Sequence, residues 1–127
     1  MPPGAPPAEA PTALLMSLAA QDLTATRDFY VRELGLALTV EEPSRLLVRV
    51  GGTSLEFRQH DGALRVEHDL QLTFLCDDPA ALLRRLRALG VEVDAPPGGG
   101  RAGVAFTARD PDGRRVAFAE RRRADDA

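Results

Sequence analysis

An internal repeat of about 55 residues constrains the fold of this chain more than any other feature. Asp22 begins a helical segment that Gly35 ends 13 residues later, and Asp78 begins a second one that Gly90 ends 12 residues later. Asp is a favoured N-cap residue, and Gly is the residue that most often follows the end of a helix. The repeat therefore predicts two copies of one small unit, neither of which can bury its own sheet face alone.

Hydrophobic patterning places helices and strands within both units. Helices are predicted over 23–34 and from Pro79, a favoured first helical residue, to the stop at Gly90. Strands are predicted at 14–20, 37–42, 45–50, 53–59, 69–76, 91–94, 103–109 and 115–120. Hairpin turns are predicted at Gly51-Gly52 and at Asp110-Pro111-Asp112-Gly113, with Gly52 matching Gly113 in the repeat. The element order is βαβββ twice, which is an α+β fold.

The helix caps and the second hairpin turn make the sequence resemble a known superfamily. The matching motifs are Asp22-Leu23, Phe29-Tyr30, Leu34-Gly35-Leu36, Asp77-Asp78-Pro79, Leu89-Gly90-Val91 and Asp110-Pro111-Asp112-Gly113. Across residues 14–121 this combination resembles the vicinal oxygen chelate superfamily of glyoxalases, extradiol dioxygenases, fosfomycin-resistance enzymes and bleomycin-resistance proteins. The resemblance implies a glyoxalase/bleomycin-resistance-like fold of two βαβββ modules with an open cleft. It also implies a homodimer whose modules pair edge to edge, often across chains, so that clefts include residues of both subunits.

Composition divides the chain into an arm, a folded domain and a tail. Residues 1–12 are rich in Pro and Ala and lack periodicity, which predicts a disordered arm. Residues 13–121 are expected to form a single domain, with module one at 13–60 and module two at 68–121. Residues 122–127 form a charged tail, for which a solvated state is the simpler reading and partner binding the alternative.

Charge and residue usage exclude several classes of function. The formal net charge of -3 argues against a nucleic-acid-binding protein. No apolar run approaches the ~20 residues that span a bilayer, and the first residues lack the basic region of a secretory signal. Cys76 is alone, which excludes an internal disulfide and a cysteine-rich zinc site, and the absence of Lys excludes Schiff-base chemistry. We expect a cytoplasmic protein that does not bind nucleic acid or membranes.

Strand alternation assigns side chains to the cleft face of each sheet, opposite the apolar face. The phase of 45–50 and of 103–109 stays open, so Phe106 would offer apolar surface either in the cleft or in the core. The candidate ligand-binding residues are Leu15, Ser17, Glu56, Arg58, Gln71, Thr73, Phe106, Arg115 and Ala117.

The resemblance also implies where a metal would bind. In metal-using members of the superfamily, each half supplies two ligands. One lies seven residues before the Asp that caps the helix, and the other lies four residues after the Gly of the hairpin turn. These positions are Leu15, Gln71, Glu56 and Ala117 in this sequence. Leu15 and Ala117 have no donor atoms, and two oxygen ligands are too few to hold a transition metal tightly. We therefore expect no metal and no other cofactor, although a rearranged His60 would be a substitute ligand.

Glu56 and the two cleft arginines each allow two interpretations. Glu56 either forms an ion pair with Arg58, Arg115 or an Arg of a partner chain, or has a raised pKa and acts as a general base. Arg58 and Arg115 either bind a carboxylate, phosphate or acyl group, or are rim charges. Gln71 either orients a ligand or bonds within the cleft wall.

The leading hypothesis for the function is metal-independent binding of a small molecule in the cleft, resembling drug or metabolite sequestration by bleomycin-resistance proteins. The first alternative is a metal-independent lyase, isomerase or cyclase in which Glu56 is the catalytic base. A second is a metal-dependent glyoxalase-like or dioxygenase-like enzyme with a degenerate site. A third is a protein that uses its cleft for dimerisation only. The expected partners are a small-molecule ligand and a second copy of the chain.

Overall fold

The computed structural model describes residues 8–66, 70–96 and 103–121 of the chain. Residues 1–7 of the predicted arm, the tail at 122–127 and the first residue of the strand predicted at 69–76 lie outside these ranges. His68, which the sequence places before that strand, also lies outside them. None of the helices in the described ranges is long and apolar enough to span a bilayer.

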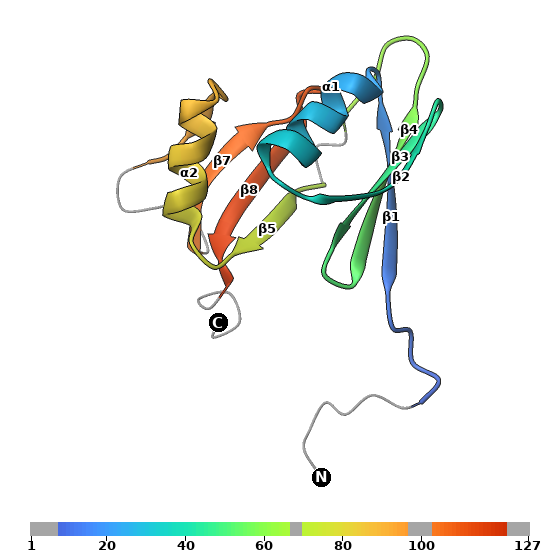
Figure 1. The fold of residues 1–127 in the computed structure, drawn as a ribbon, viewed down its shortest axis with the longest axis horizontal. Helices are drawn as coiled ribbons and strands as arrows, with labels where there is room; N and C mark the ends of the chain where they lie inside the picture. Colours follow the sequence, from blue (N-terminus) through green and yellow to red (C-terminus); the bar gives the residue numbers. More distant parts are fainter. Residues whose placement is uncertain (1–7, 67–69, 97–102, 122–127) are drawn as a thin grey trace.

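Two four-stranded sheets form the framework of the molecule (Figure 1). The first sheet has the order β1-β4-β3-β2, with β1 at Leu14–Ala20, β4 at Thr53–Gln59, β3 at Arg45–Val50 and β2 at Ala37–Glu42. The second sheet has the order β5-β8-β7-β6, with β5 at Leu72–Cys76, β8 at Arg115–Glu120, β7 at Val104–Arg109 and β6 at Val93–Asp94. β1 pairs with β4 in parallel, and β5 pairs with β8 in parallel. All the other neighbouring strands are antiparallel. The two βαβββ modules predicted from the repeat are confirmed.

The helix predicted over 23–34 changes its hydrogen bonding halfway. It begins as α1 (Leu23–Arg27), and the side chain of Asp22 caps it by accepting from the backbone N–H groups of the first turn. It continues as a π-helix, η1 (Asp28–Glu33), in which the Leu34 N–H donates to the Phe29 carbonyl at 2.9 Å. The predicted helix is therefore confirmed, and its second half is a π-helix. The wider π turn brings the adjacent rings of Phe29 and Tyr30 into the core together.

The second helix, α2 (Pro79–Ala88), follows the sequence closely. The side chain of Asp78 caps it, and Gly90 follows its end with a φ of 82°. The N–H of Val91 donates back to the Leu86 carbonyl at 2.9 Å, a Schellman-type closure. Because this closure uses the Val91 N–H, the strand predicted at 91–94 contains only Val93–Asp94.

One hydrophobic core joins the two modules. Tyr30 lies at its centre, with ring centroids 4.5 Å from Phe57 of the first sheet and 6.3 Å from Phe74 of the second. Phe106 is 1% exposed and stacks on Phe118 at 4.6 Å, so the prediction of Phe106 as a ligand-binding residue is corrected to a core position.

The core also settles the two strand phases that alternation left open. Leu46 and Val48 of β3 are buried, as are Phe106 and Ala108 of β7. One face of each sheet therefore turns inward to the shared core. We call the opposite face, which points away from the core, the outer face of that sheet.

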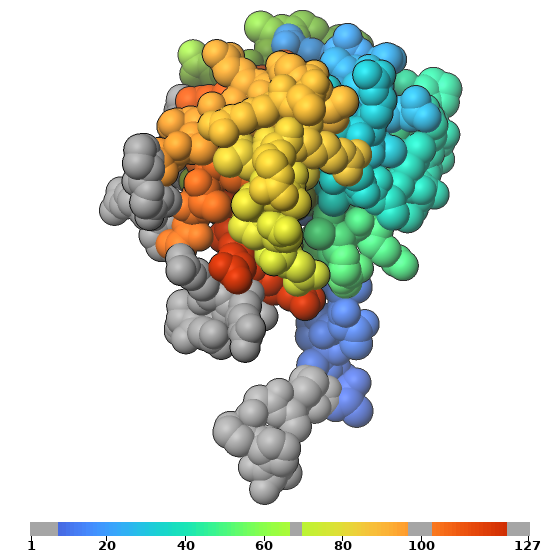
Figure 2. Space-filling view, turned by 60° about the vertical axis from the view of Figure 1, so that its left-hand side comes forward, coloured from blue at the N-terminus to red at the C-terminus, as the bar shows by residue number. Residues whose placement is uncertain are grey.

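Helix α2 covers the inner side of the second sheet and reaches the first module. In Figure 2 the atoms of α2, in yellow and orange, lie directly beside those of η1 in cyan. Arg85 donates to the Arg32 carbonyl at 2.8 Å across this boundary. Gly35, with a φ of 85°, allows this approach, since a Cβ there would lie 3.3 Å from the Arg85 guanidinium.

Candidate functional site

A buried polar cluster at the second hairpin turn fixes one module against the other. The Oδ2 of Asp110 accepts hydrogen bonds from the Tyr30 hydroxyl at 2.7 Å and from Arg114 Nη1 at 2.6 Å. Arg114 Nη2 also donates to the carbonyl of Ala19 at the end of β1. Burial, followed by the charge of Asp110, raises the pKa of the Tyr30 hydroxyl, which therefore stays protonated as a donor. The turn that aligns β8 is thus tied to the helix and first strand of module one.

On the outer face of the first sheet, both carboxylate oxygens of Glu56 have hydrogen-bond partners. Ser17 Oγ donates to Glu56 Oε1 at 2.7 Å, and Arg45 Nε donates to Oε2 at 2.9 Å. The hydrogen bond from Ser17, followed by that from Arg45, lowers the pKa of the Glu56 carboxyl. Two expectations are corrected: the ion-pair partner is Arg45, not Arg58 or Arg115, and the pKa is not raised. A carboxylate with both oxygens engaged is a weak general base.

The neighbouring candidates on this face are open to solvent. Arg58 is exposed and lines a pocket of about 320 Å³ with Ser17 and His60. The His60 Nε2 lies 3.2 Å from the Ala63 carbonyl oxygen, at the end of the strand. Leu15 is 54% exposed. This face therefore combines exposed guanidinium groups with exposed apolar surface.

The outer face of the second sheet has a floor of small side chains. Ala117 lies between Thr73 of β5 and Thr107 of β7 in the strand register, and it is 0% exposed. Gln71, just before β5, donates to the Thr73 hydroxyl at 3.2 Å, the bond within the wall that the sequence allowed. The two threonines and the alanine between them form a mildly polar platform.

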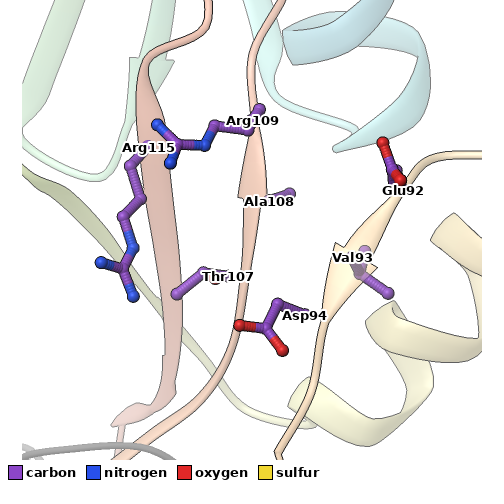
Figure 3. A pocket seen from close by; sticks show the side chains of 7 residues that line it. All are labelled: Glu92, Val93, Asp94, Thr107, Ala108, Arg109 and Arg115. Atoms are coloured by element: carbon purple, nitrogen blue, oxygen red, sulfur yellow. The ribbon is translucent and has the colours of Figure 1, made fainter.

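A larger pocket of about 500 Å³ lies on this outer face, at the β6 edge (Figure 3). Its lining residues are Glu92, Val93, Asp94, Thr107, Ala108, Arg109 and Arg115. Arg109 and Arg115 are direct partners across the β7–β8 pair, so both side chains leave the same face. Arg109 was missed because the phase of 103–109 was open. Its position opposite Arg115, across the Asp110–Gly113 turn, was the available signal.

A family model matches this architecture over nearly the whole folded part. The model of the Glyoxalase/Bleomycin resistance protein/Dioxygenase superfamily aligns with residues 12–118. The chain belongs to this superfamily. No curated protein sequence matches it significantly.

Solved structures of the superfamily resemble the chain in fold. TnmS3, an antibiotic binding protein from Streptomyces sp. CB03234, is 27% identical, with a TM-score of 0.72 over 88% of this chain and 97% of its own. A glyoxalase/bleomycin resistance protein from the same Streptomyces is 28% identical, with a TM-score of 0.68 over 85% of this chain and 99% of its own. A bleomycin resistance determinant encoded on the transposon Tn5 is 23% identical, with a TM-score of 0.67 over 84% of this chain and 94% of its own.

In this superfamily member the predicted site residues fall into two groups. Those on the outer face of the first sheet are Leu15, Ser17, Glu56 and Arg58, and those on the outer side of the second are Gln71, Thr73, Arg115 and Ala117. Because the inner faces of both sheets meet in one core, the two outer faces lie on different sides of it. Gln71 and Thr73 also line a pocket of about 340 Å³ that reaches Met16, Thr53 and Leu55 of module one. Among the described residues, none of the four candidates on the first sheet lines this pocket.

The donor set does not fit a metal ion. Within the described ranges, no group of three or more His, Cys, Asp or Glu side chains could hold one. Of the superfamily's ligand positions, Leu15 and Ala117 are hydrocarbon, and both oxygens of Glu56 are already bonded to Ser17 and Arg45. Cys76 is only partly buried, and that burial raises the pKa of its thiol, which disfavours the thiolate that a metal needs.

Proposed function

We propose that this protein binds a small organic molecule, a drug or a metabolite, without a metal ion and without transforming it. The observation that carries the proposal is the state of the superfamily's ligand positions. Leu15 and Ala117 have no donor atoms, and Glu56 is held as a carboxylate by Ser17 and Arg45. Such a surface offers apolar contact and hydrogen bonds but no activated base at Glu56.

The similarity to an antibiotic binding protein supports this proposal over an enzymatic function. That protein is 27% identical and is covered over 97% of its length, so its whole domain corresponds to this one. Sequestration requires only affinity, and exposed leucine and threonine side chains on the outer faces can supply it by burying ligand surface.

We also propose that a second copy of the chain completes the cleft. The outer face of the first sheet in one chain would lie opposite the outer face of the second sheet in the other. Among the described strands, β1 and β5 lie at the edges of their sheets, so one side of each has no strand partner there. Leu14, Leu15 and Leu75 on these strands are 56%, 54% and 46% exposed, which suits burial against a partner.

Light scattering tests the homodimer directly. We expect a dimeric mass at micromolar concentration and a monomeric mass for Leu75→Glu, since a charge would enter the paired edges. A monomeric mass for the wild type would contradict this arrangement of the cleft.

A thermal-shift screen against natural-product antibiotics, dyes and acyl compounds tests the binding function. We expect at least one saturable ligand, which mass spectrometry recovers chemically unchanged after incubation. Leu15→Gln should weaken its binding, whereas Leu89→Gln, a change of an exposed leucine at the end of α2, should not. Absence of any saturable ligand, or its conversion to a product, would overturn the proposal.

Elemental analysis tests the metal-independence of the site. We expect no stoichiometric nickel, zinc, iron or manganese in the purified protein, and no melting shift on adding these ions or a chelator. The double variant Leu15→His with Ala117→Glu restores donors at two ligand positions and should gain a metal-dependent melting shift. About one transition metal per wild-type chain, lost in Glu56→Ala, would contradict this expectation.

A further inference from the structure

We propose that Arg109 and Arg115 clamp an anionic group of the ligand, a carboxylate or a phosphate, on the outer face of the second sheet. This inference rests on the proposed function and names the chemical class that the same site would take. It extends the arginine candidates of the sequence by a residue, Arg109, that neither the family positions nor the repeat singled out.

The strand register places the two guanidinium groups on one side of the β7–β8 hairpin. Arg109 and Arg115 are directly opposite each other in an antiparallel pair, and both alternate with the buried residues Ala108 and Val116. Side chains opposite each other in such a pair have Cβ atoms about 4.5–5.5 Å apart. Figure 3 shows both side chains leaving the hairpin on the same side, over the pocket.

Neither guanidinium group of this pair forms an ion pair within the described part of the chain. Glu92 and Asp94 nevertheless line the same pocket. Like charges directly opposite across a strand pair destabilise a sheet. An anion bound between the two groups would remove this repulsion. The relief of repulsion would contribute to the free energy of binding.

One of the two guanidinium groups is already oriented. Arg109 Nη1 donates to the carbonyl of Gly113 at 3.1 Å, which holds the group against its own hairpin and leaves its other N–H groups for a ligand. Because one arginine side chain is already ordered, ligand binding costs less conformational entropy. Planar guanidinium groups match carboxylate and phosphate oxygens in two-point contacts.

The rest of the pocket sets how such a ligand would lie. Its volume of about 500 Å³ is within the range of about 300–1,000 Å³ that is typical of small-molecule sites. The acidic side chains of Glu92 and Asp94 lie on the β6 side and repel an anion. The anionic group would therefore lie at the hairpin, with the body of the ligand over Thr107.

Matched aromatic probes separate charge recognition from general apolar binding. The probes are 2-naphthoate, 2-naphthyl phosphate and the neutral 2-naphthamide, titrated by calorimetry into the full chain. Loss of a charge-assisted contact in Arg109→Met or Arg115→Met should weaken binding of the anionic probes about tenfold or more. Arg84→Met removes the same charge from the exposed side of α2 and should leave all three affinities unchanged. Whichever anionic probe binds tighter identifies the preferred oxygen group.

Asp94→Asn should change the affinity for the anionic probes in the opposite direction. Asp94 shares the outer face with the arginines, since it pairs with Thr107 in the register. Removing its charge should tighten anion binding by about two- to threefold, an effect that falls with salt.

Two outcomes overturn the inference in distinguishable ways. If 2-naphthamide binds as well as the anions and the arginine variants bind like the wild type, the clamp is wrong while small-molecule binding stands. If no probe binds and the wider ligand screen is also empty, both the clamp and the proposed function fail.

Discussion

The β3–β4 and β7–β8 hairpins are repeat copies that treat charge in opposite ways. Arg49 faces Ser54 across the first pair, and Arg109 faces Arg115 at the corresponding place in the second. Two residues further on, Glu56 in the first sheet corresponds to Ala117 in the second. The first outer face satisfies its carboxylate with Ser17 and Arg45, whereas the second opposes two arginines over a floor of alanine and threonine.

This difference shows how a duplicated unit can divide its roles. The backbone and register are shared, so the same positions reach the outer face in both modules. Side-chain choice decides whether a charged group on that face forms an ion pair, as Glu56 does with Arg45, or has none among the described residues, as is the case for Arg109 and Arg115. Substitutions in the buried cluster around Asp110 and on each outer face test this comparison.

The largest effect is expected at the buried cluster of Tyr30, Asp110 and Arg114, which connects the two modules. Asp110→Ala would leave Arg114 buried without its ion-pair partner and should lower the free energy of unfolding by about 3–5 kcal/mol. Asp112 Oδ2, buried and without a hydrogen-bond partner in the described part of the chain, lies 4.0 Å from Arg114 and would offset a small part of this loss. Urea unfolding followed by circular dichroism measures it.

Two further variants calibrate that measurement. Tyr30→Phe removes one hydrogen bond from Asp110 and should cost about 1 kcal/mol. Asp94→Ala, an exposed aspartate of the same sheet, should change stability by less than about 0.5 kcal/mol. An Asp110→Ala protein as stable as Asp94→Ala would mean that the cluster does not hold the modules together.

A gain of function would convert one hairpin into the other. Ser54→Arg opposes Arg49 with a second arginine and so reproduces the arrangement of Arg109 and Arg115 in module one. We expect a second 2-naphthoate site per chain, because a charge-assisted contact contributes on the order of 2 kcal/mol, a factor of about 30 in affinity. Calorimetric stoichiometry reports it. An unchanged stoichiometry would show that the pocket beside β6, and not the arginine pair, determines anion binding.

The smallest effect concerns pH and the face that contains Glu56. Because the folded-state pKa of Glu56 is lowered below its ordinary value of 4.5, its pairing stabilises the protein above that pH. The contribution is lost as the pH falls through the folded-state pKa. Melting temperatures from pH 7 to pH 3 should therefore fall less steeply in Glu56→Gln than in the wild type. Glu92→Gln, an exposed glutamate of module two, serves as the control. Parallel curves for wild type and Glu56→Gln would refute the assigned pairing.

Sequence alone determined the repeat, the order of helices and strands along the chain and the helix caps, because these depend on local patterns. Asp22 and Asp78 cap their helices as expected, and Gly90 takes the left-handed conformation that ends α2. Alternation also placed Leu15, Glu56 and Ala117 on the face opposite the core. Each of these features follows from residues close in the chain, where backbone hydrogen bonds and side-chain period fix the outcome.

Only the tertiary structure decided which partners meet. Arg45 reaches Glu56 because β3 and β4 are neighbours in the sheet, and this contact decides between the two interpretations of Glu56 in favour of an ion pair and a lowered pKa. Phe106 went to the core because Phe118 lies beside it, and that choice sent Arg109 to the outer face opposite Arg115. The π turn at Phe29 and Tyr30 depends on rings from both sheets. Packing and electrostatics act between residues that are distant in sequence, so they emerge only when the chain is folded.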